Sequence, residues 1–313
     1  MDPLEGTLTP LAGGHSGETF LAETAAERSV VRIYGPRSAD RGPHAAEVDA
    51  AVLRLVRGLL PVPEVLEVRR ANDVAGTPPL LVTSYLPGER LDVALPGMSD
   101  ELRHQVGIEL GRMLARLSQM PMLRGGAFID GDLRIGDFPA AAADLEAWLD
   151  GNLTGTALAS WEGSDVDGLR AVARRAQDLL DRLDRVSLVH SDFNPKNVLV
   201  EPGTGEVTGL LDWEFAHAGL PVADLGNLLR FDREPVFMDA VVSTFCSLVP
   251  PLPGDVLDLA RAADLYALID LAARRDDNVV ARRAHDQLLG VARTGDLHAD
   301  LHADPDSLPD RVP

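Results

Sequence analysis

The sequence predicts an α+β chain of two lobes, with a small antiparallel sheet and one helix first and a mostly helical region after it. Short β-branched and alternating runs separated by Gly and Pro occupy the first 86 residues, whereas Ala-, Leu- and Arg-rich stretches with helical periodicity follow. Inside the second part, two apolar runs, 198–200 and 207–211, flank a turn with Pro and Gly. That pattern predicts a β-hairpin.

In the N-terminal part, the runs that predict strands are 7–11, 19–22, 29–34, 66–68 and 80–85, and the run that predicts a helix is 45–56. The turn between the first two strands is rich in glycine, so its backbone N–H groups, at Gly14, Ser16 and Gly17, could lie along phosphates. Any hairpin would also use glycines there, and the turn is not a complete G-x-G-x-x-G.

Arg32 lies in the middle of the third strand among apolar residues, where a charge usually needs a partner. Glu47 is near the start of the helix, fifteen residues later. A strand cation and a helix carboxylate can form the ion pair that holds a nucleotide-phosphate contact in place. The plain alternative is an edge-strand Arg and a surface Glu.

The composition changes near residues 84–90, which predicts an N-terminal lobe at 1–86, a C-terminal lobe at 87–294 and a disordered acidic tail at 295–313. A strand that runs into a connector between two lobes presents free backbone groups, to which an adenine edge could bond. Helices are expected at 100–118 with Ser99 as N-cap, at 140–149, at 165–185 with Ser164 as N-cap, at 221–230, 236–248, 256–274 and 279–294.

The most informative stretch is His190-x-Asp192-x-x-x-x-Asn197, followed fifteen residues later by Asp212. The predicted hairpin would bring its two ends together, so that Asn197 at the entrance can meet Asp212 at the exit. Two carboxylates and a carboxamide form an all-oxygen site suited to magnesium. The same order of residues occurs in the catalytic loop and metal-binding Asp of kinases.

The formal net charge of −20 and pI of about 4.7 predict a chain that repels nucleic acid and anionic membranes. Such a charge would attract a polycationic small molecule, although acidity also serves solubility. The first residues have no basic segment or apolar segment typical of secretion, and the longest uncharged run, 240–254, is too short for a membrane span. We therefore expect a cytoplasmic protein.

The segments 190–197 and 211–214, with Pro221-x-x-Asp224-Leu-Gly, resemble the aminoglycoside phosphotransferase and choline kinase-like family. The resemblance extends in layout over about residues 7–294, through Gly13-Gly14, 31–33, Glu47 and 86–89. It implies a protein-kinase-like fold with a five-stranded N-lobe, a connector and a helical C-lobe. It also implies transfer of the γ-phosphoryl group of ATP or GTP to a small-molecule hydroxyl, with Mg²⁺.

Carried over from this resemblance, Asp192 would accept or orient the proton of the acceptor hydroxyl, and Asn197 and Asp212 would hold magnesium. Arg32, paired with Glu47, would contact the phosphates, and Ser84 and Leu86 would bond the base. The remaining motif residues have supporting roles: His190 braces the loop, Asp224 anchors its backbone, and Glu214 acts on the metal directly or through its ligands. Arg32 replaces the lysine of many members, and a guanidinium also binds phosphate.

Three readings of the function remain open. An aminoglycoside-like cationic antibiotic, with a role in antibiotic resistance, could use acids of the C-terminal lobe, namely Asp232, Glu234, Asp264, Asp270, Asp276 and Asp277. A metabolic hydroxyl compound such as choline, ethanolamine or a sugar derivative is the alternative, with choline disfavoured by the scarcity of aromatic residues. A nucleotide-binding pseudokinase is the third reading, opposed by the presence of Asp192, Asn197 and Asp212. The oligomeric state is open.

Overall fold

The computed structural model describes residues 7–11, 18–23, 27–35, 38, 41–71, 76–142, 144–232 and 234–299. The chain forms two compact units. Unit 1 contains residues 1–137, 186–224 and 231–249, and unit 2 contains residues 138–185, 225–230 and 250–313. The boundaries expected at residues 86 and 294 stay predictions, and most of the expected tail, 300–313, lies outside the described residues.

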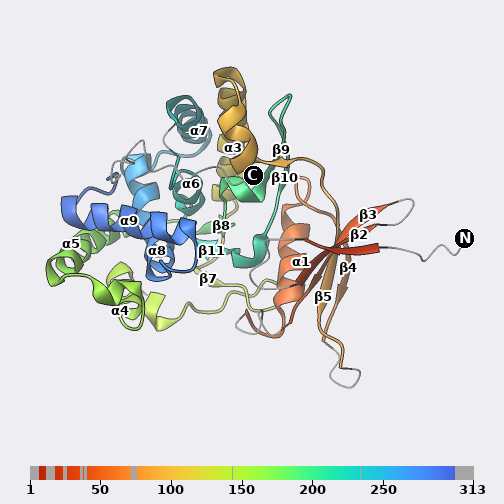
Figure 1. The fold of residues 1–313 in the computed structure, drawn as a ribbon, viewed down its shortest axis with the longest axis horizontal. Coiled ribbons are helices and arrows are strands. Elements are labelled where there is room, and N and C mark those ends of the chain that lie inside the picture. The colour runs from red at the N-terminus through yellow and green to blue at the C-terminus, as the bar shows by residue number, and fades with distance from the viewer. Residues whose placement is uncertain are drawn as a thin grey trace, which may run out of the picture. The chain divides into compact units, whose positions relative to one another are not determined.

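Unit 1 begins with an antiparallel sheet that, within the described residues, has five strands in the order β1-β2-β3-β5-β4. These strands are β1 (Thr7–Pro10), β2 (Glu18–Glu23), β3 (Arg28–Ile33), β4 (Val65–Arg69) and β5 (Leu80–Ser84). Helix α1 (Ala45–Val56) packs against β4 and β5, as Figure 1 shows. All five predicted strands and the helix are therefore confirmed.

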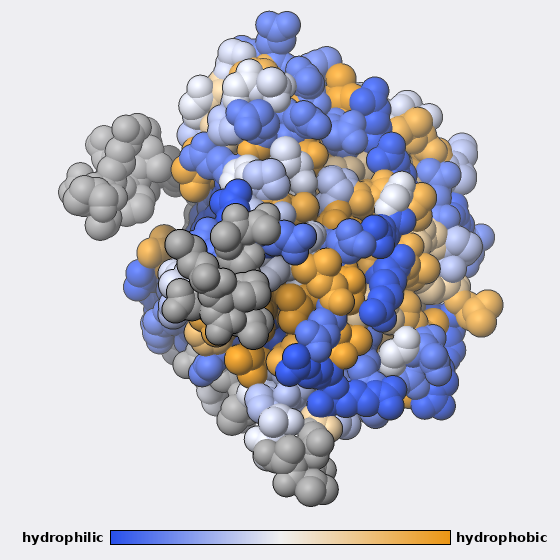
Figure 2. All heavy atoms as spheres, turned by 90° about the vertical axis from the view of Figure 1, so that its right-hand side faces the viewer, coloured by the Kyte–Doolittle hydropathy of each residue, from blue (hydrophilic) through white to orange (hydrophobic). Residues whose placement is uncertain are grey.

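Strand pairing decides which way Arg32 points. Arg32 lies directly opposite Leu81 of β5, so the two side chains share one face of the sheet. Leu81 is buried, which makes this the covered face. The other face carries Val31 and Val82, which are half-buried. Figure 2, which views the sheet side of Figure 1, shows apolar surface there interrupted by hydrophilic side chains.

The rest of unit 1 contains the predicted hairpin and two long helices. Its elements are β6 (Glu89–Arg90), α2 (Leu91–Ala94), α3 (Asp100–Ser118), β7 (Gly126–Ala127), β8 (Ser187–Val189), β9 (Val198–Glu201), β10 (Glu206–Leu210), β11 (His217–Gly219) and α7 (Pro235–Leu248), and α6 (Ala223–Leu228) runs from unit 1 into unit 2. Two small sheets form within the described residues, β10-β9-β6 and β7-β11-β8. The first of these joins the hairpin to the segment that follows β5.

Helices α3 and α7 make the close contact of the unit 1 core. A Cβ atom at Gly107 would stand 2.8 Å from Cβ of Ala240, and one at Gly111 would stand 2.7 Å from the carbonyl oxygen of Val241. Glycine at both positions lets the two helix backbones approach, and this packing supports β8, which contacts α3.

Unit 2 is helical, with α4 (Leu145–Asn152), α5 (Gly163–Leu180), α8 (Val256–Ala273) and α9 (Val279–Thr294). Two predicted starts were wrong. Ser164 lies inside α5, whose N-cap is Glu162, and the helix expected from residue 140 begins only at Leu145. Asp144 sets that start because its side chain accepts a hydrogen bond from the N–H of Ala147 at 2.7 Å. With its antiparallel N-terminal sheet and helical C-terminal region, the chain has the predicted α+β fold class.

Candidate active site

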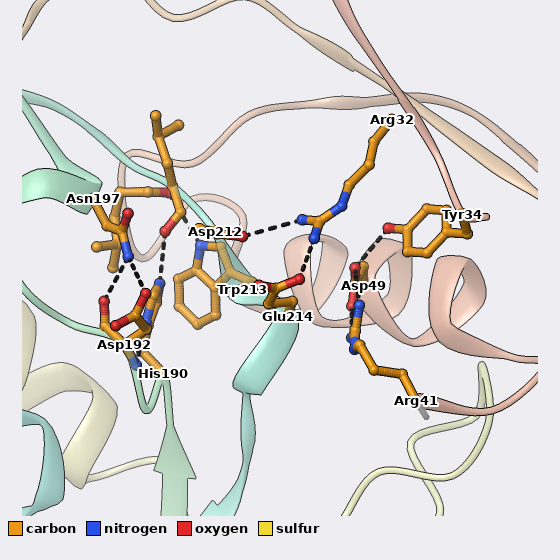
Figure 3. Close-up of polar contacts among 12 residues, drawn as sticks. Arg32, Tyr34, Arg41, Asp49, His190, Asp192, Asn197, Asp212, Trp213 and Glu214 are labelled. Atoms are coloured by element: carbon orange, nitrogen blue, oxygen red, sulfur yellow. Dashed lines mark hydrogen bonds and ion pairs between the residues drawn. The ribbon is translucent and has the colours of Figure 1, made fainter. Parts of the chain in front are cut away.

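The hairpin brings Asn197 and Asp212 to the same end, as predicted. Strands β9 and β10 pair so that Leu210 lies opposite Val198, and the N–H of Leu211 donates to the carbonyl oxygen of Asn197 at 2.8 Å. Asn197 precedes β9 and Asp212 follows β10, so this hydrogen bond brings the two residues to the same end of the hairpin (Figure 3). The whole site described below lies within unit 1.

The carboxylate of Asp192 is held by two carboxamides of its own loop. Nδ2 of Asn194 donates to Oδ1 at 2.6 Å, and Nδ2 of Asn197 donates to Oδ2 at 2.7 Å. Nδ2 of Asn197 also donates to the backbone carbonyl of Asp192 at 2.8 Å. The nitrogen of Asn197 is thereby committed to the loop, which leaves its carbonyl oxygen as the atom suited to a metal ion.

Two buried side chains determine the backbone path of this loop. Asp224 accepts hydrogen bonds from the N–H groups of His190 and Ser191, both at 2.8 Å, and thereby holds Ser191 in a left-handed conformation with φ of 66°. Nδ1 of His190 accepts from the N–H of Asp192 at 3.2 Å, so its Nε2 carries the hydrogen and donates to the carbonyl of Leu211 at 2.9 Å. His190 therefore links the loop to the exit of the hairpin.

Burial sets the protonation of these two supports. It lowers the pKa of His190 to about 4, so the imidazole is neutral near pH 7 and keeps the tautomer that both hydrogen bonds require. Burial also raises the pKa of Asp224 to about 7, against the opposing effect of the two N–H groups that donate to it. Both residues are suited to positioning the loop.

Arg32 bridges the two acids that follow β10 (Figure 3). Its Nη1 donates to Oδ1 of Asp212 at 3.1 Å, and its Nη2 donates to Oε2 of Glu214. Asp212 adopts a left-handed conformation with φ of 63°, and the short 3-10 helix Trp213–Phe215 that follows buries Glu214. Arg32 and Asp212 are 180 positions apart, so only the folded chain brings them together.

The charges of this trio influence one another. Burial opposes the charge on Arg32, but Tyr34, Glu214 and Asp212 outweigh it and raise the pKa of the guanidinium above its usual value. Burial, followed by the neighbouring carboxylate of Asp212, raises the pKa of Glu214. Arg32 thus acts as the counter-ion of two crowded acids.

The predicted pair of Arg32 with Glu47 is wrong. Glu47 contacts Nδ1 of His44 at 2.9 Å and Nε of Arg70 at 2.6 Å. The inward carboxylate of α1 is Asp49, which is 3% exposed. Asp49 lies on the helix face of Val52, Leu53 and Val56, whereas Glu47 is offset from it by two residues, or about 200°.

Asp49 connects a second arginine, Arg41, to Tyr34, the aromatic residue next to Arg32. It accepts a hydrogen bond from the hydroxyl of Tyr34 at 2.6 Å and is paired with both terminal nitrogens of Arg41, with Nη1 at 2.9 Å. The guanidinium of Arg32 lies 5.5 Å from the ring centroid of Tyr34. Asp49 occupies a position on the buried i, i+3, i+4 face of α1. The helical periodicity of the sequence could therefore have identified it as the inward carboxylate.

These contacts give a direct comparison of the two α1 carboxylates. We expect Asp49→Ala to destabilise the fold by about 2–3 kcal/mol, because it leaves the mostly buried Arg41 and the Tyr34 hydroxyl without their partner. Glu47→Ala is the matched control. It should cost less than about 1 kcal/mol, because His44 and Arg70 are solvent-exposed. Urea unfolding measures both, and equal losses would contradict the assignment of Asp49.

The other predicted nucleotide contacts are only partly described. Gly14, Ser16 and Gly17 lie outside the described residues. Ser84 ends β5, and its N–H donates to the carbonyl of Glu64 at 2.8 Å. Leu86 lies in the connector after β5, and within the described part of the chain neither its N–H nor its C=O takes part in a hydrogen bond.

The donor set at the end of the hairpin fits magnesium. Among the described residues, no group of three or more His, Cys, Asp or Glu side chains is arranged to hold a metal ion. Magnesium needs less than that, since one or two carboxylates with a carbonyl oxygen, water and substrate phosphates suffice. Asp212 and the carbonyl oxygen of Asn197 supply such a set, and Glu214 lies beside it through their shared contact with Arg32.

Several of the acids expected to bind a cationic acceptor have structural partners instead. In unit 2, Asp264 is buried and accepts two hydrogen bonds from Arg230, at 2.8 and 2.6 Å, while Asp270 pairs with Arg274. In unit 1, Glu234 caps α7 by accepting from two backbone N–H groups. These pairings leave fewer acids for an acceptor than the sequence indicated.

The antiparallel N-terminal sheet with its helix and the helical C-terminal region define a kinase-like phosphotransferase fold. Comparison with known families identifies the family to which the chain belongs. The chain matches the phosphotransferase enzyme family over residues 7–246 and belongs to it. The predicted family is thereby confirmed.

Solved structures with the same fold include an aminoglycoside 2′-phosphotransferase-IIIa mutant in complex with GDP, with a TM-score of 0.68, 16% identity and coverage of 92% of both chains. A thermostable mutant of aminoglycoside phosphotransferase APH(4)-Ia, in complex with ADP and hygromycin B, has a TM-score of 0.65 and 17% identity, over 92% of this chain and 94% of that one. At these identities the similarity concerns the fold.

Curated relatives by sequence are parts of longer proteins. Mouse acyl-CoA dehydrogenase family member 10 is 26% identical over 217 residues, which are 68% of this chain and 19% of that protein. Mouse acyl-CoA dehydrogenase family member 11 is 22% identical over 231 residues, 72% of this chain and 28% of that protein. The chain thus spans less than a third of either relative. Separately, none of its described helices has the length and apolar character to cross a membrane.

Proposed function

We propose that this chain transfers the γ-phosphoryl group of ATP or GTP to a hydroxyl of a small molecule. The observation that carries the proposal is the meeting of Asp192, Asn197 and Asp212 at one end of the hairpin, where Arg32 of the sheet donates a hydrogen bond to Asp212. Phosphoryl transfer depends mainly on positioning and on neutralising the charge of the transferred group, and this cluster offers both.

Each side chain has a role in this proposal. Asp192 orients the acceptor hydroxyl and takes its proton, and the two carboxamides that bond to it fix its direction. Asn197 and Asp212 hold Mg²⁺, which supplies the charge that neutralises the phosphates when it is bound. Glu214 supports that set, and His190 and Asp224 keep the loop in place.

Arg32 has two successive partners in the proposal. Without nucleotide it neutralises Asp212 and Glu214. With Asp212 holding the metal, the guanidinium would be available to contact the phosphates, as would the glycine-rich turn predicted at Gly14, Ser16 and Gly17. A guanidinium remains charged throughout and suits phosphate oxygens.

Two acceptor classes have a specific observation in their favour. The net charge of −20 favours an aminoglycoside-like cationic antibiotic, and the fold neighbours include enzymes in complex with hygromycin B and gentamicin. The structural pairing of Asp264, Asp270 and Glu234 weakens that class.

The second class is a metabolic hydroxyl compound. Its support is that the curated sequence relatives carry the name of acyl-CoA dehydrogenases rather than of antibiotic-modifying enzymes. A hydroxylated acyl thioester therefore joins choline, ethanolamine and sugars among the metabolic acceptors to be tested. A CoA thioester is anionic, so added salt would lower its KM by screening its repulsion from this acidic chain. The KM of a polycation would rise with added salt, because its attraction to the chain is screened.

The test is a coupled ADP-release assay over aminoglycosides, hydroxyacyl-CoA thioesters, choline, ethanolamine and sugars, with ATP or GTP and Mg²⁺. We expect turnover that one acceptor class stimulates and that depends on Mg²⁺. The phosphorylated product, identified by mass spectrometry, then gives the position of the hydroxyl. Nucleotide binding without stimulation by any acceptor would instead support the pseudokinase reading.

A further inference from the structure

The β9–β10 hairpin carries an irregularity that faces the connector after β5. Val207 pairs with Val200 and Gly209 pairs with Leu199, so Thr208 is an extra residue between two regular pairs. This is a β-bulge, a feature that redirects a side chain and increases the local twist of a strand. The bulge lies on the strand that leads directly to Asp212.

Thr208 uses its redirected side chain on the connector. Its hydroxyl donates to the carbonyl oxygen of Pro87 at 2.7 Å. The next residue, Gly88, has φ of 140°, and a Cβ there would stand 2.5 Å from Oγ1 of Thr208. The connector therefore lies directly against the bulge, and only glycine permits this approach at position 88.

Gly209 provides the second contact of the bulge. A Cβ at this position would stand 2.9 Å from Cδ1 of Leu86 and 3.2 Å from Cδ1 of Leu199. The side chain of Leu86 consequently rests on the bare backbone of Gly209. Beyond Gly88, the connector continues into β6, where Glu89 pairs with Val200 of the same hairpin.

The residue that these contacts fix has uncommitted backbone groups. The N–H of Ser84 is bonded to Glu64 and that of Tyr85 to Arg28, whereas Leu86 makes no backbone hydrogen bond among the described residues. A polar backbone group of a half-buried residue needs water or a ligand as a partner. A purine edge offers a donor and an acceptor at the spacing of one residue's N–H and C=O.

We propose that Thr208 and Gly209 are positioning residues for the nucleotide base, because they hold Leu86 so that its backbone can bond the base edge. This inference rests on the proposed function. It adds that the same hairpin positions two parts of the nucleotide site. Its end presents Asp212 to the phosphates, and its bulge places the connector for the base. Affinity for the nucleoside part therefore depends on a threonine hydroxyl outside the phosphate site.

The test compares two probes, ATP and inorganic tripolyphosphate, each with Mg²⁺, by isothermal titration calorimetry on the full chain. Thr208→Val keeps the shape and removes the hydroxyl. We expect the Kd for ATP to rise about fivefold to tenfold, as for loss of one hydrogen bond, and the Kd for tripolyphosphate to stay unchanged. Thr208→Ser should restore the affinity for ATP.

Two further variants complete the test. Thr204→Val, the same substitution at the exposed tip of the hairpin, is the control and should bind both probes as the parent does. Gly209→Ala, which displaces Leu86, should reproduce the selective loss of ATP affinity. In steady-state assays, Thr208→Val should raise KM for ATP and leave KM for the acceptor unchanged.

Other outcomes overturn specific statements. If Thr208→Val binds ATP as tightly as the parent, or weakens ATP and tripolyphosphate equally, Thr208 has no selective role toward the base. If the parent itself binds neither ATP nor GTP, the proposed function fails together with this inference. Thermal unfolding of each variant shows whether a loss of binding comes from a loss of fold. If Thr208→Val does not fold, the binding of ATP and tripolyphosphate by Gly209→Ala tests the inference in its place.

Discussion

Asp192→Asn is expected to lower kcat for phosphoryl transfer by about 10³-fold, because an amide cannot accept the proton of the acceptor hydroxyl. Nucleotide affinity should change by less than about twofold, since this carboxylate is assigned to the acceptor and not to the phosphates. Single-turnover kinetics and calorimetric titration with ATP measure the two quantities. A large change in one with little change in the other is the signature of a group that acts only in the chemical step.

The asparagine variant is chosen because it preserves size and can still accept one of the two hydrogen bonds from Asn194 and Asn197. Asp167→Asn, at an exposed position of α5, is the matched control and should behave as the parent. Turnover of Asp192→Asn at the parent rate would remove Asp192 from the role of base. Equal losses of binding and rate would show that the substitution damages the loop.

Asp212→Asn has the second large effect, and it should be visible in binding as well as in rate. Removal of the carboxylate from the metal set should abolish the increase in ATP affinity that Mg²⁺ produces in the parent. It should also lower kcat by about 10³-fold, through the loss of several kcal/mol of transition-state stabilisation. The measurement is a titration of ATP at several Mg²⁺ concentrations.

Arg32 gives this variant a second, distinguishable readout. Arg32 loses its ion pair with residue 212 and keeps that with Glu214, so affinity for ATP without metal should remain or increase slightly. An unchanged dependence on Mg²⁺ would exclude Asp212 from the metal site. Equal weakening at every Mg²⁺ concentration would indicate a loss of local structure.

Local patterns predicted most of the fold because the signals that end a helix or turn a hairpin are themselves local. Helices α1 and α3 occupy the predicted residues, and the side chain of Ser99 accepts a hydrogen bond from the N–H of Leu102 as an N-cap does. The wrong starts of α4 and α5 have the same origin. Packing within unit 2, such as the hydrogen bond from the N–H of Leu145 to Gln177 of α5, helps to fix the start of α4 after Asp144. Ser164 is also a residue type that caps helices, but α5 already begins at Gly163, with Glu162 as N-cap.

The candidate site likewise has a part that the sequence predicted and a part that it did not. Asp192, Asn197 and Asp212 belong to one loop and one hairpin, so their spacing alone indicated that they meet. The partner of Arg32 could not be found by spacing, because the third strand and the end of the hairpin are 180 positions apart. Glu47 was a reasonable choice by distance along the chain, but the direction of its side chain on α1 excludes it.

By itself, the sequence determined the fold class, the family and the hairpin with its catalytic loop, since these depend on periodicity, turns and motif spacing within short segments. Only the tertiary structure decided that Arg32 neutralises Asp212 and Glu214, that Asp49 supports Arg41 and Tyr34, and that the bulge at Thr208 holds the connector. The physical reason is that charges and hydrogen-bonding groups choose partners by proximity in space and by burial. Neither quantity is encoded by separation along the chain.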